Sequence, residues 1–600
     1  MPDASRHAWS LAALPLAIGL ASFAGSAQAV SFNIGDVQAQ FDSQLSIGAS
    51  MSTQSADKRF ISVQNGGEAA ARTSDDGRQN YQAGDVFSKI FRGVHDLELN
   101  YGDSGAFLRG KYWYDFETKD GSQRFYDIDD SGRAPLVKGS GTALLDAFVY
   151  HNYSIGNNPG NVRLGRQVVS WGESTFIGNS INSINPVDVA AFRRPGAEIK
   201  EGLLPVEMLY FSQGLTDNLS MEAFYQLKWA PFAIDNCGTF FGSDTLAVGC
   251  NDRLVVAGVD NPQGQQPSAS TIVRARKDRD ASDDGQFGVA FRYFVPQLND
   301  TELGFFAMNY HSRSPIYSSI AGVPPGLGTP ITGIDGGAGP AGYFFEYPED
   351  IRLYGMSFQT NLGGTAVSGE VSYRPNMPMQ ISTGDQSRTA LVNAFLGQDN
   401  THRGLSVGVG DEIPGYVRKE FYQAQVTAIH FIERVLGASR LSLVGEAGVN
   451  YIGGLGDTTK FGRDSLFGQS PFVEGDGGGA VPGQCSSFQG TPVGGSPNAA
   501  SWCENDGFYT EWSSGYRVRA QLDYSNVIAG INLSPNLTWS HDVDGYGPNF
   551  TENAKAISVG LNADYGNKYN ASLSYTDFFD GKYNTNVDRD FLALSVGVSF

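Results

Sequence analysis

The sequence predicts an all-β chain that forms a single transmembrane antiparallel β-barrel of about 16–18 strands, with long extracellular loops of which one folds into the lumen. Three observations predict this fold. The 600 residues include 75 Gly and 12% aromatic residues but only 18% charged residues. Segments of alternating hydrophobicity follow one another along the chain, and their connections alternate between short and long.

Composition also excludes several classes of protein. Gly has no three-residue period, which excludes collagen, and the content of 7 Trp, 27 Tyr and 38 Phe excludes general disorder. The formal net charge of −21 argues against a nucleic-acid partner, because Lys and Arg carry that kind of binding. No later window approaches 18 uninterrupted apolar residues, so the sequence does not predict a helical membrane protein.

The first segment predicts export. An apolar stretch over residues 8–24 follows Arg6, and Ala27-Gln28-Ala29 forms an A-x-A cleavage site. This pattern predicts a signal peptide over 1–29 and a mature barrel over 30–600. A membrane anchor is the alternative, but the apolar run is shorter than the roughly 20 residues needed to span a bilayer.

The carboxy-terminal strand alternates cleanly between two faces. Leu592, Leu594, Val596, Val598 and Phe600 share one face, while small or polar residues occupy the other. A wall strand between lipid and an aqueous lumen has this pattern. A strand of a soluble sandwich would alternate in the same way, but a terminal Phe is typical of bacterial outer-membrane barrels.

The same alternation predicts a full series of strands. The candidate strands are residues 40–52, 91–101, 105–117, 143–153, 161–171, 206–214, 218–229, 285–296, 302–312, 351–361, 365–375, 417–433, 439–452, 512–526, 529–540, 554–566, 568–578 and 589–600. Short periplasmic turns alternating with long outer loops are typical of outer-membrane barrels, and an even count leaves both termini in the periplasm. Pro535 weakens one strand, so 16 strands stay an alternative.

One hairpin allows a prediction of register. With Asp103-Ser104 as a two-residue turn, Glu98 lies opposite Arg109 and Asp96 lies opposite Lys111. Such opposed charges would stabilise the pairing by roughly 0.2–1 kcal/mol each. The sequence therefore predicts a ladder of charges on the lumen face of this hairpin.

Four cysteines remain in the mature chain. Cys237 and Cys250 lie close together in one long loop, and Cys485 and Cys503 lie close together in another. Three connectivities are possible, and local pairing within each loop is the one we expect in an oxidising compartment. A zinc site is the weaker alternative, since no C-x-x-C or nearby His supports it.

Residues 172–205 are the candidate constriction. Asn185-Pro186 predicts the start of a short helix that runs to Phe192 and stops at Pro195-Gly196. We expect this segment to narrow the lumen, with two arginines facing carboxylates across it; an ordinary exposed loop is the alternative. The charged residues of the segment are Arg193, Arg194, Glu198, Lys200 and Glu201.

The preceding strand holds a conflict. Arg163 and Arg166 differ in parity, so both cannot face the lumen of a regular strand. An Arg that faces lipid near the midplane costs roughly 2–4 kcal/mol. Either a bulge turns one of them inward, or one lies near a membrane interface.

The segment 161–205 carries a family resemblance. Residues 165–173 (GRQVVSWGE), 183–188 (SINPVD) and 193–201 (RRPGAEIKE), with the signal peptide and terminal strand, resemble the proteobacterial outer-membrane family called domain of unknown function 1302. The barrel pattern extends over nearly the whole mature chain. The resemblance implies an outer-membrane barrel of unsettled substrate that is often suspected of handling hydrophobic compounds.

The sequence favours a channel or facilitator for small organic solutes, including hydrophobic or aromatic ones, in contact with outer-membrane lipid. The alternative is a closed barrel that serves as a surface or assembly component with a periplasmic transfer partner. Enzyme motifs are weak: residues 404–408 match G-x-S-x-G but lack the strand-to-helix elbow that makes the serine reactive. No cofactor motif or metal-ligand spacing is present, so we expect no enzyme, cofactor or metal centre.

Overall fold

The computed structural model describes residues 30–71, 73–195, 199–247, 249–250, 253–255, 271–322, 330–334, 336–396, 408–471 and 504–600. The predicted signal peptide, residues 1–29, lies outside this range and stays a prediction. Among the described residues, no helix combines the length and the apolar character needed to cross a membrane.

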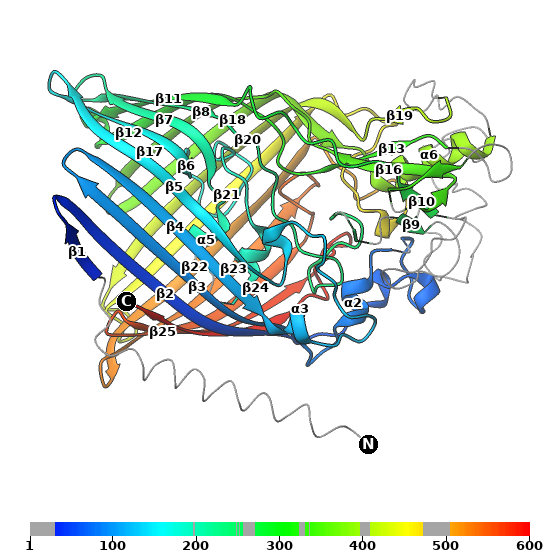
Figure 1. Cartoon of the computed structure of the whole chain (residues 1–600), viewed down its shortest axis with the longest axis horizontal. Helices are drawn as coiled ribbons and strands as arrows, with labels where there is room; N and C mark the ends of the chain where they lie inside the picture. Colours follow the sequence, from blue (N-terminus) through cyan, green and yellow to red (C-terminus); the bar gives the residue numbers. More distant parts are fainter. Residues whose placement is uncertain are drawn as a thin grey trace.

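Within the described residues, 18 strands form a closed antiparallel barrel (Figure 1). The last strand closes the ring on the first, with pairs from Gln44↔Ser599 to Ser52↔Phe591. The wall strands are β2 (Val37–Ser52), β3 (Val86–Tyr101), β4 (Ser104–Asp115), β5 (Ser140–Ile155), β6 (Asn158–Gln167), β7 (Val206–Gly214), β8 (Leu219–Gln226), β11 (Phe287–Val295), β12 (Thr301–Tyr310), β17 (Ile351–Leu362), β18 (Thr365–Gln380), β20 (Tyr416–Glu433), β21 (Arg440–Gly453), β22 (Trp512–Ile528), β23 (Ile531–Asp544), β24 (Lys555–Tyr565), β25 (Tyr569–Phe579) and β26 (Phe591–Ser599).

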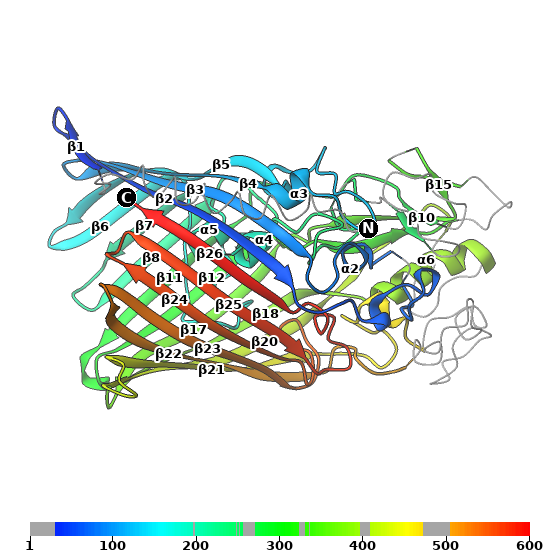
Figure 2. The ribbon, with the colours of Figure 1, turned by 90° about the horizontal axis from the view of Figure 1, so that it is seen from below.

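The two ends of the barrel differ in the length of their connections. Short turns, such as those between β3 and β4 and between β17 and β18, lie at the end that holds the C-terminus and β1 (Val30–Ile34), while the long connections gather at the other end (Figures 1 and 2). The predicted strand series and its alternation are therefore confirmed. Pro535 lies inside β23 opposite Leu561, so the count is 18 and not 16.

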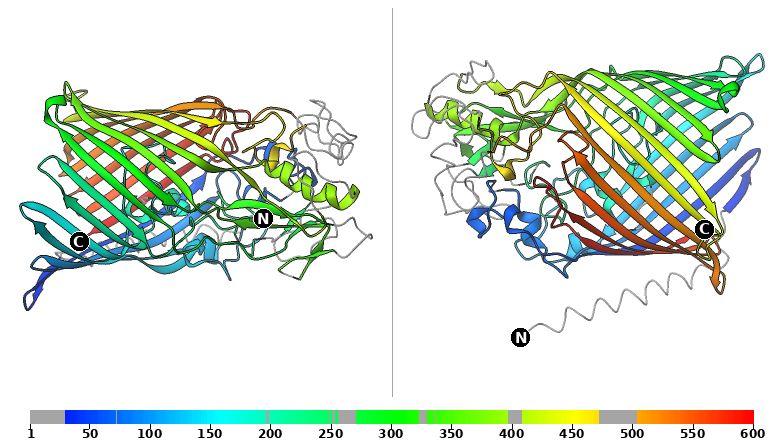
Figure 3. Two further views of the ribbon diagram at one scale, coloured as in Figure 1. Left: turned by 90° about the horizontal axis from the view of Figure 1, so that it is seen from above. Right: turned by 180° about the vertical axis from the view of Figure 1, so that it is seen from behind.

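Helices and a second sheet occupy the long connections. A five-stranded sheet of order β19-β13-β16-β10-β9 lies beyond the long-loop end of the wall, as both views of Figure 3 show. The helices are α2 (Asp76–Asn80), α3 (Phe116–Asp120), α4 (Val189–Arg193), α5 (Ile199–Gly202) and α6 (Thr383–Leu396). The remaining strands are β9 (Arg253–Val255), β10 (Thr271–Arg274), β13 (Ile316–Ile320), β14 (Ile331–Thr332), β15 (Ala338–Gly339), β16 (Ala341–Glu346) and β19 (Glu412–Ile413).

The carboxy-terminal strand has the two faces that its sequence predicts. Leu594 and Val596 are 51% and 44% exposed on the outside of the wall, while Ala593 and Ser595 are 8% and 4% exposed on the inside. Apolar side chains outside and small or polar ones inside suit a wall between lipid and an aqueous lumen.

The predicted register of the β3–β4 hairpin is wrong by two residues. Asp96 lies opposite Arg109, so the turn is Gly102-Asp103 and not Asp103-Ser104. Gly102 has a φ of +57°. Glycine adopts this angle without steric cost, and the tight turns of two-residue hairpins require it.

The register shift keeps each side chain on its predicted face but changes its partner. Arg109 forms an ion pair with Asp96 at 2.7 Å. Glu98 instead accepts a hydrogen bond from the Tyr150 hydroxyl at 3.1 Å. Lys111 pairs with a residue of the loop inside the barrel, as described below.

A backbone irregularity at Gly165 lies between Arg163 and Arg166, the two arginines whose parity conflicts in a regular strand. Gly165 has a φ of +131°, although β6 keeps its register with β5. The Arg163 guanidinium lies 5.1 Å from the centroid of the neighbouring Tyr210 ring. Arg166 lies within electrostatic reach of Asp146, which also pairs with Arg109. β6 itself contains no inserted bulge residue; the register shift of this region lies in the pairing of β4 with β5, between Leu108 and Gly110.

Candidate functional site

The connection between β6 and β7, residues 168–205, enters the barrel; we call it the inner loop. Its helices α4 and α5 lie within the outline of the wall in Figures 1 and 2. Asn185 joins the ends of the loop: its Oδ1 accepts from the Val169 N–H at 2.9 Å, and its Nδ2 donates to the carbonyl oxygens of Gln167 (3.1 Å) and Leu204 (2.9 Å).

The inner loop is attached to opposite sides of the ring. On one side, Arg92 of β3 pairs with Glu201 at 2.5 Å and Lys111 of β4 pairs with Asp188 at 3.1 Å. On the other side the loop is bound to β18 and β21. Because β3 and β18 face each other in the strand order, the loop crosses the lumen from wall to wall.

The attachment to the far wall depends on two buried carboxylates, Glu370 of β18 and Glu446 of β21, each 3% exposed. Glu446 accepts from the backbone N–H groups of three consecutive residues, Thr175 (3.0 Å), Phe176 (2.5 Å) and Ile177 (2.8 Å). Hydrogen bonds to an ionised acceptor are about twice as strong as neutral ones.

Glu370 binds the segments on either side of that tripeptide. It accepts from the N–H groups of Glu173 at 2.5 Å and Ile181 at 3.3 Å. Gln425 of β20 donates to both carboxylates and to the Ile177 carbonyl oxygen at 3.2 Å. We call Glu370 and Glu446 the carboxylate pair; together they fix residues 173–181 against the wall.

One side of the inner loop is packed into an apolar core. Trp171 is 1% exposed, its ring centroid lies 5.0 Å from that of Phe224, and its Nε1 donates to Glu222 at 2.7 Å. The loop and the strands β7, β8, β11, β12 and β17 contribute the rest of this core, which we call the apolar half of the lumen. Its other members are Val169, Ile181, Ile184, Val206, Met208, Tyr210, Ala290, Phe306, Met308, Tyr310, Ile351 and Leu353.

The other side of the inner loop faces a wall of small polar residues. Ser558 of β24 lies opposite Thr576 of β25, and Ser572 lies opposite Ser595 of β26. The same face of β23 carries Asn536 and Thr538, among others. Hydroxyl and amide groups hydrogen-bond to water, so this part of the wall is suited to an aqueous lumen. We call this region, over β22–β26 and β2, the polar half.

The predicted helix of the inner loop starts three residues later than expected. α4 begins at Val189, and Asp188 is its N-cap, with Oδ1 accepting from the Ala191 N–H at 2.9 Å. Asn185, predicted as the cap, instead joins the ends of the loop. Asp188 is fully buried, and its Oδ2 accepts a hydrogen bond from the ammonium group of Lys111.

Two arginines end α4 at the border of the polar half. Arg193 pairs with Asp235 of the β8–β9 connection at 2.5 Å. Burial raises the pKa of the Asp235 carboxyl above its ordinary value, against the opposing effect of Arg193 and Arg194. The Arg194 guanidinium lies 5.4 Å from the Trp113 ring centroid. The sequence prediction that both arginines face carboxylates across the lumen differs from the structure: in the described part of the chain, neither arginine pairs with a carboxylate of the barrel wall. Backbone N–H groups instead occupy the carboxylate pair.

A cavity of about 450 Å³ lies between these arginines and the wall. The inner loop contributes Arg193, Arg194 and Pro195, and the β8–β9 connection contributes Phe241. Strands β25 and β26 and their connection close the other side, with Ser572, Ser574, Thr576, Phe578, Asn586, Phe591 and Ala593. This cavity in the polar half is the candidate functional site.

The remaining predicted lumen residues fall in different places. Glu201 and Lys200 lie in α5, where Glu201 binds Arg92. Glu198 lies outside the described residues. Asp96 and Arg109 bind each other across the β3–β4 hairpin, whereas Lys111 and Glu201 attach the inner loop to the wall.

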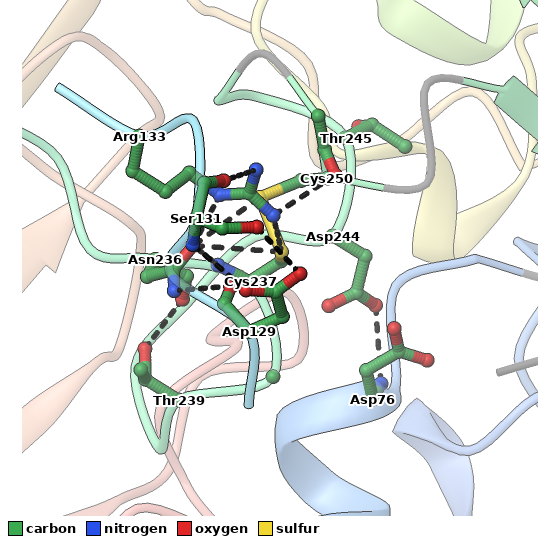
Figure 4. Close-up of a disulfide and its surroundings, with 12 residues drawn as sticks. Asp76, Asp129, Ser131, Arg133, Asn236, Cys237, Thr239, Asp244, Thr245 and Cys250 are labelled. Carbon is green, nitrogen blue, oxygen red and sulfur yellow. Dashed lines mark hydrogen bonds between the residues drawn. A yellow bond between two sulfur atoms is a disulfide. The ribbon is translucent and has the colours of Figure 1, made fainter. Parts of the chain in front are cut away.

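The predicted disulfide between Cys237 and Cys250 is confirmed. Figure 4 shows Arg133 lying against it: Nη2 contacts the Cys237 sulfur at 3.3 Å and donates to the Gly249 carbonyl oxygen at 2.9 Å, and Nε donates to Asn236 at 2.7 Å. The bridge therefore stabilises the connection that supplies Asp235 and Phe241. Cys485 and Cys503 lie outside the described residues.

Two features of the site, the carboxylate pair and the buried position of Trp171 in the apolar core, are not predicted from the sequence. Glu446 is recognisable from alternation as an inward residue, and Glu370 lies on the polar face of its strand. Nothing in a single sequence links Glu370 and Glu446 to backbone groups that lie 189–271 residues away. A single acidic residue among small residues on a lumen-facing strand is the sequence feature that could have identified each of these two carboxylates.

Comparisons with known proteins give one family and several similar folds. The family model described as "Protein of unknown function (DUF1302)" matches residues 10–600. None of the curated proteins compared with the chain matches it.

Several solved structures are similar over most of the chain. Acinetobacter baumannii OccAB1 has a TM-score of 0.39 and 10% identity, covering 96% of this chain and 98% of its own. Pseudomonas aeruginosa OccK2 (OpdF) in complex with glucuronate has a TM-score of 0.37 and 9% identity, covering 94% and 97%. Pseudomonas aeruginosa OpdK with vanillate has a TM-score of 0.36 and 10% identity, covering 94% and 98%.

Proposed function

This chain belongs to the DUF1302 family, and we propose that it is an outer-membrane channel through which small organic solutes, including hydrophobic or aromatic ones, diffuse passively. The inner loop is the constriction of this channel. Solutes pass through the polar half, between α4 and the hydroxyl-bearing wall of β23–β26. Passage down a gradient needs no covalent chemistry and no cofactor.

The division of the lumen carries this proposal. The inner loop crosses from β3 to β18, and its apolar side chains fill the space toward β7–β17. The space toward β23–β26 is bounded by Ser, Thr and Asn side chains and contains the 450 Å³ cavity. A loop that served only to close the barrel would gain more by packing apolar residues on both sides, because apolar burial contributes about 25 cal/mol per Å².

Swelling of liposomes tests the proposed function. Protein refolded into liposomes is expected to accelerate swelling in isotonic solutions of small neutral and charged organic solutes, and to do so less for larger ones. Heat-unfolded protein in the same liposomes is the control. Absence of swelling from a barrel whose folded state is verified by its heat-dependent electrophoretic mobility would contradict a passive channel.

A closed barrel that docks a periplasmic transfer partner is the second candidate function. One observation favours it: β1 extends past the end of β26 and exposes Val30, Phe32 and Ile34 by 51%, 42% and 63%. Apolar side chains at the short-turn end could contact a partner or lipid. If the folded protein did not accelerate swelling, this candidate function would be favoured over the channel.

A further inference from the structure

Resting on the proposed channel function, we propose that the cavity beside Arg194 is a binding site for small organic anions that carry a flat apolar body. The carboxylate of the solute pairs with Arg194. Its apolar body lies among the rings of Phe241, Phe578 and Phe591, which line the same cavity.

Charge is the first support for this site. Arg193 is neutralised by Asp235 at 2.5 Å. Arg194 contacts the Trp113 ring and, in the described part of the chain, forms no ion pair with a carboxylate. Arg194 lines the cavity, and it shares the single carboxylate of Asp235 with Arg193, which leaves one positive charge in excess at this place. A guanidinium in such surroundings attracts anions and can bind a carboxylate through two parallel N–H groups.

The wall opposite the inner loop carries a second cation. Arg519 of β22 donates to the Gln521 amide oxygen at 3.1 Å and, like Arg194, has no ion pair among the described residues. Its row of cross-strand neighbours leads through Thr538 and Ser558 to Thr576 of the cavity. Neighbouring strands lie about 4.8 Å apart, so Arg519 stands roughly 14 Å from Thr576 along the wall. The polar half therefore contains two cationic side chains, Arg194 and Arg519, with which a permeating anion can interact.

Size and composition favour an organic ligand over an inorganic ion. A volume of about 450 Å³ falls in the range of pockets that hold small organic molecules. Three aromatic rings provide apolar contact, while Ser572, Ser574 and Thr576 can exchange hydrogen bonds with a hydroxyl or carboxylate group. The same cavity therefore accommodates both ends of an amphiphilic anion.

Ion selectivity tests the charge of the site separately from the size of the channel current. The whole chain has a net charge of −21, which by itself favours cations, so an anion preference can arise only from local groups in the passage. In planar bilayers with a KCl gradient, the intact protein is expected to prefer chloride. R194Q is expected to lower the chloride-to-potassium permeability ratio by at least about threefold, R519Q by less, and R194K hardly at all.

Two further variants sharpen this measurement. D235N removes the partner of Arg193 and is expected to raise the anion preference. R124Q is the matched control, because Arg124 lies on the outer β4–β5 connection with a side chain 58% exposed; it is expected to leave the permeability ratio unchanged.

Block of the potassium chloride current by organic ions tests the apolar part of the site. Benzoate is expected to block more strongly than acetate, which lacks the ring, and more strongly than benzylammonium, which reverses the charge. R194Q is expected to weaken the benzoate block at least about fivefold. Equal block by benzoate and benzylammonium, or a chloride preference that survives R194Q, would overturn the inference while leaving the channel intact. Absence of any current in the folded protein would instead contradict the proposed function.

Discussion

Replacing both members of the carboxylate pair, E370Q together with E446Q, is expected to release residues 173–181 from the wall and to enlarge the channel current. Five backbone N–H groups donate hydrogen bonds to these carboxylates, and in the double variant they would lose their charged acceptors. Each hydrogen bond to a charged group contributes about 1.5–3 kcal/mol, so the loop is expected to lose roughly 3–6 kcal/mol of attachment after partial compensation by the amides.

Single-channel recording measures this effect. The double variant is expected to show larger and more frequently fluctuating openings than the intact protein. E420Q is the matched control, since Glu420 is an exposed carboxylate on the neighbouring strand β20 and accepts a hydrogen bond from the Tyr373 hydroxyl of the wall. Openings of unchanged size and duration in a folded double variant would mean that the carboxylate pair does not hold the constriction.

Replacement of Trp171 by alanine is expected to loosen the inner loop from the apolar half. The side chain is fully enclosed, between Phe224 at 5.0 Å and Phe306 at 5.8 Å between ring centroids. Truncation of a buried Trp costs about 3–5 kcal/mol. Glu222 keeps Arg292 at 3.0 Å as a partner, so the loss is chiefly one of packing.

Hydrogen exchange followed by mass spectrometry measures this loosening directly. Amides of residues 169–184 are expected to exchange faster in W171A, while those of the strands β24–β26 exchange as before. W171F restores most of the apolar contact and is expected to restore most of the protection. Equal protection of the loop in W171A and the intact protein would show that the apolar core does not fix the loop.

The wall of the barrel was predictable because side-chain alternation and turn formation depend on residues close together in the sequence. Alternation with a period of two and a regular series of turns predicted 16–18 strands, of which the structure has 18, and Leu594 and Ser595 lie on the expected faces. Register was harder, because it depends on which residue of the turn takes a positive φ. The sequence analysis placed the turn at Asp103-Ser104, whereas Gly102, which has a positive φ, occupies its first position in the structure.

The partners of the inner loop were not predictable for a different reason. The sequence marked residues 172–205 as unusual by their helix signals and clustered charges, and it placed Arg193 and Arg194 in that segment. It suggested that these arginines meet carboxylates of the far wall. The wall carboxylates Glu370 and Glu446 instead accept hydrogen bonds from backbone N–H groups. Because nearly every residue has a backbone N–H group, the sequence cannot indicate which of them will bind a given carboxylate.

Modification of cysteines placed in the two halves of the lumen tests the central claim, that solutes pass only through the polar half. Ser574 lines the cavity, whereas Ala290 is fully buried in the apolar half. Addition of a methanethiosulfonate reagent to single channels is expected to reduce the current of S574C in steps and to leave A290C and the unsubstituted protein unchanged. Loss of current in A290C, or an unchanged current in S574C after mass spectrometry has verified its modification, would contradict the division of the lumen.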